Sequence, residues 1–78
     1  MNRDRRIRLG RAVALLSDAA NIIRNVLNEE QFSYDNLPEN FQESDRGVSM
    51  EDAIDSMEDA LEDIRSAENT ISEIDGVM

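Results

Sequence analysis

Apolar residues recur every seven positions in the C-terminal half of the chain. One heptad column holds Met50, Met57, Ile64, Ile71 and Met78, and a column three residues later holds Ala53, Ala60, Ala67 and Ile74. Side chains spaced by three and four residues fall on one face of an α-helix. We therefore predict an amphipathic helix over residues 49–74, with a narrow apolar seam and an acidic outer face.

A broader apolar pattern occupies residues 4–31, which we predict to be the first helix. Its apolar residues fill four of the seven heptad columns, whereas a seam between two helices needs only two. One intramolecular partner covers one side, so the surplus face predicts a second subunit. The residues expected at that oligomer interface are Leu9, Leu15, Leu16, Ile22 and Ile23.

Residues 32–48 connect the two helices and are longer than the usual 2–8 residues or so between antiparallel helices. Asn36, Pro38 and Glu39 resemble a helix start, with an N-cap residue, a proline in the first turn and a glutamate three residues later. A short helical turn near residues 37–44 is expected. The aromatic residues of this connector either close the end of the hairpin as an apolar plug or form a binding lip.

Ser49 and Asp52 form a capping box that favours the start of the second helix at residue 49. An alternative start one turn earlier, at Ser44, would place Gly47 inside the helix. Gly76 marks the end of the helix. The resulting fold is all-α: an antiparallel helical hairpin with a long capped connector, which assembles into a dimeric or higher-order helical bundle.

The chain has 78 residues, which is enough for a single small domain, residues 1–78. Below roughly 70–80 residues one core seldom supplies more than about 3–5 kcal/mol, so such chains often rely on disulfides, metals or oligomers. Cysteine and histidine are both absent, which excludes disulfides and zinc sites. Oligomerisation is the means of stabilisation that remains.

Charge is divided unevenly along the sequence. Residues 1–28 carry a net charge of +4 and residues 29–78 a net charge of −14, for a total of −10. Direct binding to nucleic acid is not expected from so acidic a chain. Antiparallel packing would bring the N-terminal arginines to the acidic end of the second helix, where ion pairs with Glu68, Glu73 and Asp75 are their simplest role.

Catalysis is not expected. Without histidine and cysteine, the chain lacks the commonest general base, the thiolate nucleophile and the softer metal ligands. A carboxylate-based, magnesium-dependent nucleotide hydrolase remains an alternative, since Asp59 and Glu62 lie three residues apart. These acids, however, belong to columns opposite the apolar seam, whereas a metal site inside a bundle needs them inward. We predict no cofactor and no metal site.

Two kinds of binding surface are candidates. Exposed carboxylates on a helix can imitate a phosphate backbone and bind a protein that normally holds nucleic acid, although a solvated helix face is the commoner explanation. Arginines one turn apart can bind a phosphate together, and aromatic residues are frequent at binding hot spots. The acidic candidates are Asp55, Glu58, Asp59 and Glu62; the ligand-binding candidates are Arg5, Arg8, Arg11, Tyr34 and Phe41.

No membrane span is expected, because the longest apolar run covers only residues 12–16 and a span needs about 20 residues. The basic start followed by this run is similar to a signal peptide. Asp18, Asn21 and Arg24 interrupt it at helical spacing, which argues against that interpretation. We expect a protein of the bacterial cytoplasm.

The stretch Tyr34–Gly47 contains Tyr-Asp-Asn-Leu-Pro-Glu, and residues 50–64 read Met-Glu-Asp-Ala-Ile-Asp-Ser-Met-Glu-Asp-Ala-Leu-Glu-Asp-Ile. Together they resemble small acidic helical proteins of unassigned function, encoded by phages and mobile elements of Gram-positive bacteria. The resemblance covers about residues 30–75 and brings no catalytic residues. It implies an accessory protein of a mobile element, a setting in which small non-enzymatic proteins often block host defence.

We therefore expect an oligomeric, non-catalytic protein that binds and sequesters a component of host defence, either a protein or a nucleotide-type signal. A structural or assembly module without a ligand is the first alternative, and the magnesium-dependent hydrolase is the second.

Overall fold

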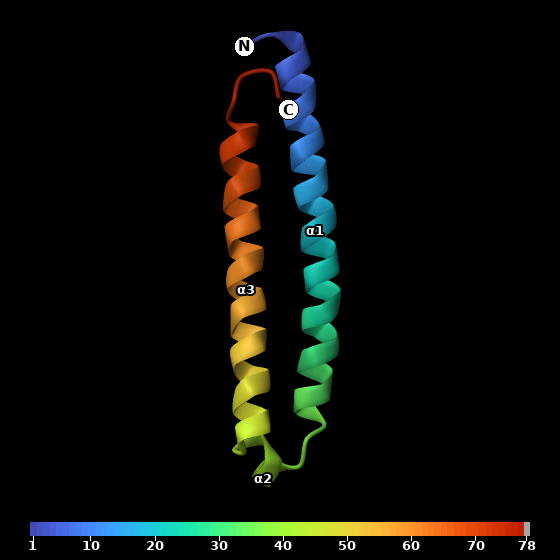
Figure 1. Cartoon of the computed structure of the whole chain (residues 1–78), viewed down its shortest axis with the longest axis vertical. Coiled ribbons are helices and arrows are strands. Elements are labelled where there is room, and N and C mark those ends of the chain that lie inside the picture. The colour runs from blue at the N-terminus through green and yellow to red at the C-terminus, as the bar shows by residue number, and fades with distance from the viewer. Residues whose placement is uncertain (78) are drawn as a thin grey trace.

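Two long antiparallel helices form the molecule, which the structure, a computed structural model, describes over residues 1–77. Helix α1 spans Arg3–Asp35, the short α2 spans Glu39–Gln42 and α3 spans Asp45–Ser72. Figure 1 shows α1 and α3 side by side, with α2 in the turn at one end and both termini at the other. The rod measures 58 × 15 × 13 Å. The all-α helical hairpin predicted from the heptads is confirmed. Met78, the last member of one predicted heptad column, lies outside the described residues.

Helix α1 runs to Asp35, beyond the predicted end at residue 31. Hydrogen bonds extend it: the Gln31 side-chain amide donates to Asp35 Oδ1 at 3.0 Å, one turn further on. Asn36, expected to cap the next helix, instead closes α1 by donating from Nδ2 to the Phe32 carbonyl at 2.7 Å. Pro38 then disfavours helical backbone at the residue before it. The predicted helical turn follows at once as α2.

Helix α3 begins earlier than the capping box at Ser49 predicts. Ser44 is the N-cap, and its hydroxyl oxygen accepts a hydrogen bond from the Gly47 backbone N–H. The alternative start at Ser44 is therefore correct, and the connector shortens to residues 36–44 including α2. At the other end α3 stops at Ser72, two residues before the predicted end, and Gly76 adopts a positive φ of 84° in the turn that follows.

Gly47 fits inside α3 because the end of α2 passes directly over it. A Cβ atom at this position would lie 2.1 Å from the Gln42 carbonyl oxygen and 2.7 Å from Gln42 Cα. Only a residue without a side chain permits this approach. The glycine that reads as a helix breaker in the sequence is thus the contact point between α2 and α3.

The core is a thin seam between α1 and α3. Ala20, Met50 and Ile54 are its buried apolar residues, and no side chain in residues 1–77 is completely buried. The alanines of the second heptad column are only half-buried: Ala53, Ala60 and Ala67. Because each helix covers the other on one side only, most seam residues keep some contact with solvent.

The connector phenylalanines do not close the end of the hairpin. Phe32 keeps 71% of its surface exposed and Phe41 is also exposed, whereas Leu37 is half-buried. The apolar plug is therefore wrong for both phenylalanines. None of the helices in residues 1–77 has the length and apolar character that a membrane crossing requires.

Candidate functional site

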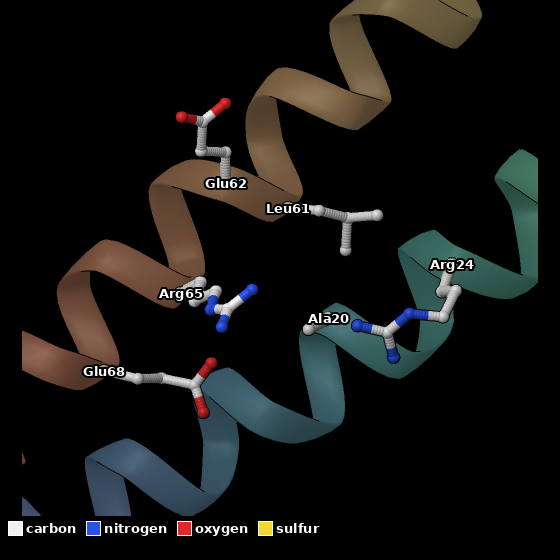
Figure 2. A pocket seen from close by; sticks show the side chains of 6 residues that line it. All are labelled: Ala20, Arg24, Leu61, Glu62, Arg65 and Glu68. Carbon is white, nitrogen blue, oxygen red and sulfur yellow. The ribbon is translucent and has the colours of Figure 1, made fainter.

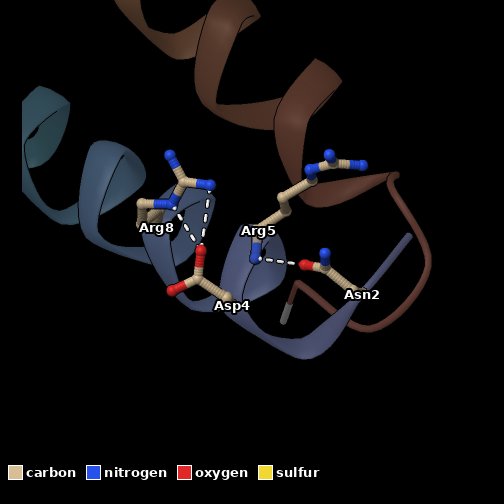
Figure 3. Close-up of polar contacts among 4 residues, drawn as sticks. All are labelled: Asn2, Asp4, Arg5 and Arg8. Atoms are coloured by element: carbon tan, nitrogen blue, oxygen red, sulfur yellow. Dashed lines mark hydrogen bonds and ion pairs between the residues drawn. The ribbon is translucent and has the colours of Figure 1, made fainter.

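At the arginine end of the hairpin, polar contacts join residues of the first turns of α1 and its N-cap (Figure 3). Arg8 donates from Nε to Asp4 Oδ2 at 3.0 Å and forms an ion pair with the same oxygen at 2.9 Å. Asn2 Oδ1 accepts from the Arg5 backbone N–H at 2.9 Å and caps the helix. Met1, Arg5, Arg8 and Leu9 line a shallow hollow of about 350 Å³. Asp4 offsets one of the two charges that an anion would meet there.

The predicted ion pairs between the two helices do not form. Arg8–Asp4 is the one ion pair within 4.0 Å among residues 1–77, so Glu68, Glu73 and Asp75 have no described arginine partner. Arg6 meets the C-terminal turn by packing instead, since a Cβ on Gly76 would lie 2.8 Å from Arg6 Cδ. Its Nε is buried without a described hydrogen-bond partner. Arg11 is exposed and does not line the hollow.

Tyr34 joins α1 to α3 at the opposite end of the rod. Its hydroxyl donates a hydrogen bond to the Glu51 carboxylate, and its backbone carbonyl accepts from Gln42 Nε2 at 3.2 Å. Tyr34 therefore stabilises the connector, whereas the side chain of Phe41 is exposed. Because the hairpin is 58 Å long, one chain cannot bring Arg5, Arg8 and Tyr34 into one pocket.

The bond to Glu51 raises the pKa of the Tyr34 hydroxyl above its ordinary value of 10.0, and partial burial and the charge of Glu51 act in the same direction. Tyr34 is the only tyrosine, so phenolate absorbance reports it alone. We expect Glu51→Gln to lower the titration midpoint toward 10, because the charged acceptor is lost. Asp52→Asn, a neutralisation of the adjacent acid, should leave the midpoint in place.

The same shift makes the Tyr34 contribution to stability dependent on pH. A raised folded-state pKa means that the folded state binds more protons than the unfolded state above pH 10 or so. The contribution is therefore fully present below that pH and is lost as the pH rises further. The melting temperature of the wild type should fall toward that of Tyr34→Phe in this range; a constant difference would contradict the hydrogen bond.

Four carboxylates form an acidic ridge on one flank of α3, where Asp55 and Glu58 also line a hollow with Gln31 and Tyr34 of α1. We use this name for Asp55, Glu58, Asp59 and Glu62, all of which are exposed. At 100° per residue they fall within about 100° of one another, centred roughly 130° around the helix from the buried Met50. Among residues 1–77 no arginine lies within ion-pair distance of them. The structure thus brings together the whole acidic set that the heptads predict.

A hollow at the middle of the hairpin brings together two arginines, Arg24 and Arg65, that the sequence did not single out as a site. Arg24, Arg65 and Glu68 surround it with Ala20, Leu61 and Glu62, and its volume is about 430 Å³ (Figure 2). Arg24 donates to Asn21 Oδ1 at 3.0 Å, and Figure 2 shows Glu62 directed away from both arginines. The small Ala20 leaves room there, but no local sequence signal indicates the hollow, because Arg24 and Arg65 belong to different helices.

The predicted interface residues separate into two groups. Leu9, Leu16 and Ile23 are half-buried on the face of α1 that carries Ala20, toward α3. Leu15 and Ile22 are exposed on another side of the helix. The hairpin itself therefore covers one group and leaves the other open.

The carboxylates of residues 1–77 form no cluster of three or more that is placed to hold a metal ion. Comparisons with protein-family models, curated proteins and solved structures gave no match to this chain. Its function is therefore inferred from its own residues.

Proposed function

We propose that the protein is a non-catalytic binding protein that docks its acidic ridge on a basic surface of another protein and sequesters it. The observation that carries this proposal is the set of four exposed carboxylates on one side of a rigid helix, without a described arginine partner. Carboxylates that are not neutralised within their own chain are available to a cationic partner. Such charges accelerate association and select the partner.

The spacing of the ridge supports a partner that normally binds a phosphate backbone. The four ridge positions span seven residue steps, a rise of about 10.5 Å along the helix, which averages about 3.5 Å between neighbouring carboxylates. Phosphates of one DNA strand are separated by about 3.4 Å along the duplex axis. The ridge therefore presents a row of negative charge of similar density. In the setting that the sequence resemblance implies, the partner is a protein of host defence.

A matched pair of variants tests the ridge. One neutralises it with Asp55→Asn, Glu58→Gln, Asp59→Asn and Glu62→Gln; the control neutralises four exposed acids elsewhere with Glu39→Gln, Glu43→Gln, Glu73→Gln and Asp75→Asn. Both have the same net charge. The probes are two peptides of one composition: an amphipathic helix with four arginines on one face, and a scrambled version.

We expect calorimetry to show tighter binding of the helical peptide and, in the ridge variant, an affinity roughly tenfold lower or more, since each exposed ion pair is worth about 0.2–1 kcal/mol. The control should retain the wild-type affinity. Salt should weaken the binding, because exposed charges are screened over about 8–10 Å at 0.1–0.15 M. Equal losses in the two variants, or equal binding of the two peptides, would contradict recognition by the ridge.

A nucleotide-type ligand at the arginine end is the second candidate, and the hollow beside Arg5 and Arg8 favours it. The probe is a nucleoside diphosphate. If it binds with micromolar affinity and Arg5→Glu with Arg8→Glu abolishes binding while helicity is kept, the arginine end is the working surface and the ridge is a solvated face.

A further inference from the structure

An apolar stripe on the outer side of α1 has no partner within the hairpin. Leu15, Ile22 and Val26 keep 54%, 65% and 47% of their surface exposed. Together with the half-buried Ala19 they are spaced by four, three and four residues, which is the spacing of a coiled-coil seam. We call these four residues the outer stripe.

The outer stripe is distinct from the face that contacts α3. At 100° per residue its four positions fall within about 60° of one another, and their centre lies roughly 130° around α1 from the buried Ala20. A helix with two apolar faces at such an angle has the pattern of a bundle helix that contacts two neighbours.

We propose that the outer stripe binds the outer stripe of a second copy of this chain, with the two α1 helices antiparallel, to form a homodimer with α1 at its centre. The dimer would leave the acidic ridge of α3 free. Surface area, the order of residues in the stripe and the charges that flank it all favour this arrangement.

The surface area of the hairpin is larger than a compact protein of its size exposes. For a mass of 8.8 kDa the expected accessible surface is about 4,800 Å², whereas the chain exposes 5871 Å². The excess of roughly 1,100 Å² exceeds the 800 Å² or so that each partner buries in an interface of standard size. The radius of gyration, 17.4 Å, also exceeds the compact value of about 11.5 Å.

The order of residues makes the stripe complementary to itself when the helices are antiparallel. With the two-fold axis between Ala19 and Ile22, Leu15 faces Val26 of the second copy, and Ala19 faces Ile22 of the second copy. Each layer then pairs a larger side chain with a smaller one. Parallel helices would instead place alanine opposite alanine and leave a gap in the seam. A symmetric interface of this kind needs only one patch per chain.

The charges that flank the stripe favour the same orientation. Arg8 and Arg11 lie on its N-terminal side and Glu29 on its C-terminal side, and all three are exposed. In the antiparallel dimer both arginines come within about one helical turn, along the axis, of Glu29 of the second copy. In a parallel dimer each of these charges would lie opposite the same residue of the second copy, and the like charges would repel.

Light scattering during size exclusion tests the dimer in the full chain at micromolar concentration. We expect twice the chain mass for the wild type and for Ser17→Glu, and half of that value for Ile22→Glu. Ser17 is exposed and lies nearly opposite the stripe, so it carries the same added charge outside the interface. A folded wild-type monomer would assign the stripe to a different partner and overturn the proposal, as would a dimer that tolerates Ile22→Glu.

Cross-linking decides the orientation even if Ile22→Glu unfolds the chain. The sequence has no cysteine, so Leu15→Cys and Val26→Cys are each unique. An oxidised mixture of the two variants should give a disulfide-linked dimer, whereas either variant alone should give at least tenfold less. Identical positions would be about 16 Å apart along the antiparallel axis, and a disulfide needs Cα atoms within about 7 Å. Efficient cross-linking of either variant alone, or none in the mixture, would overturn the antiparallel dimer.

Discussion

Gly47→Ala should lower the stability of the hairpin substantially. The added Cβ would meet the carbonyl oxygen, carbonyl carbon and Cα of Gln42 at 2.1, 2.5 and 2.7 Å. All three are backbone atoms, so no side chain can rotate out of the way. Either α2 must detach or the first turn of α3 must unwind. Overpacking typically costs about 1–3 kcal/mol, which is a large part of the total for so small a domain.

Gly10→Ala is the matched control. A Cβ at Gly10 would have the Val77 carbonyl oxygen as its nearest neighbour at 3.7 Å, an ordinary contact. Alanine is better than glycine in a helix interior by about 0.5–1 kcal/mol. The two identical changes should therefore shift the melting temperature in opposite directions, as followed by circular dichroism at one protein concentration. A Gly47→Ala melt at or above that of the wild type would show that α2 does not rest on α3.

The two glycines differ in a tertiary contact that the sequence does not reveal. Apolar residues recur at helical spacing in both halves of the chain, so the two helices of the hairpin can be predicted from periodicity. The start of α3 depends instead on Gln42 lying over Gly47, a tertiary contact that local propensity does not contain. Local signals favour a helix start at Ser49, where Ser49 and Asp52 match a capping box. A start at Ser44 puts Gly47 inside the helix, which is unfavourable unless something packs against the glycine.

The candidate surfaces divide in the same way. The acidic ridge follows from the heptad alone, because its positions fall outside the apolar columns. The two apolar faces of α1 could not be assigned from sequence, since Leu16 and Ile22 are equally apolar and either face could meet α3. The role of Tyr34 was also hidden, because its bond to Glu51 joins residues 17 positions apart.

Ile54→Asp should unfold the hairpin at neutral pH. Ile54 has the smallest exposed fraction of the core residues, 5%, and an unpaired charge there would cost several kcal/mol. Glu51, Asp55 and Glu58 lie one to four residues away on the same helix and add repulsion. The cost of the buried charge and of this repulsion together is comparable with the roughly 3–5 kcal/mol that one small core supplies. Circular dichroism should therefore show a loss of helicity. Ser56→Asp, the same charge at an exposed position of α3, should remain folded.

The pH dependence distinguishes a buried charge from a packing defect. In the folded Ile54→Asp variant, burial and the neighbouring acids would raise the pKa of the new carboxyl above its unfolded value of about 3.9. The folded state then binds more protons between the two pKa values, so stability relative to the wild type falls as the pH rises through that window. Helicity should therefore return as the pH is lowered toward 4, while the Ile54→Ala variant, which leaves a cavity without a charge, should show no such recovery. If both variants respond alike to pH, position 54 is not in the core that joins α1 to α3.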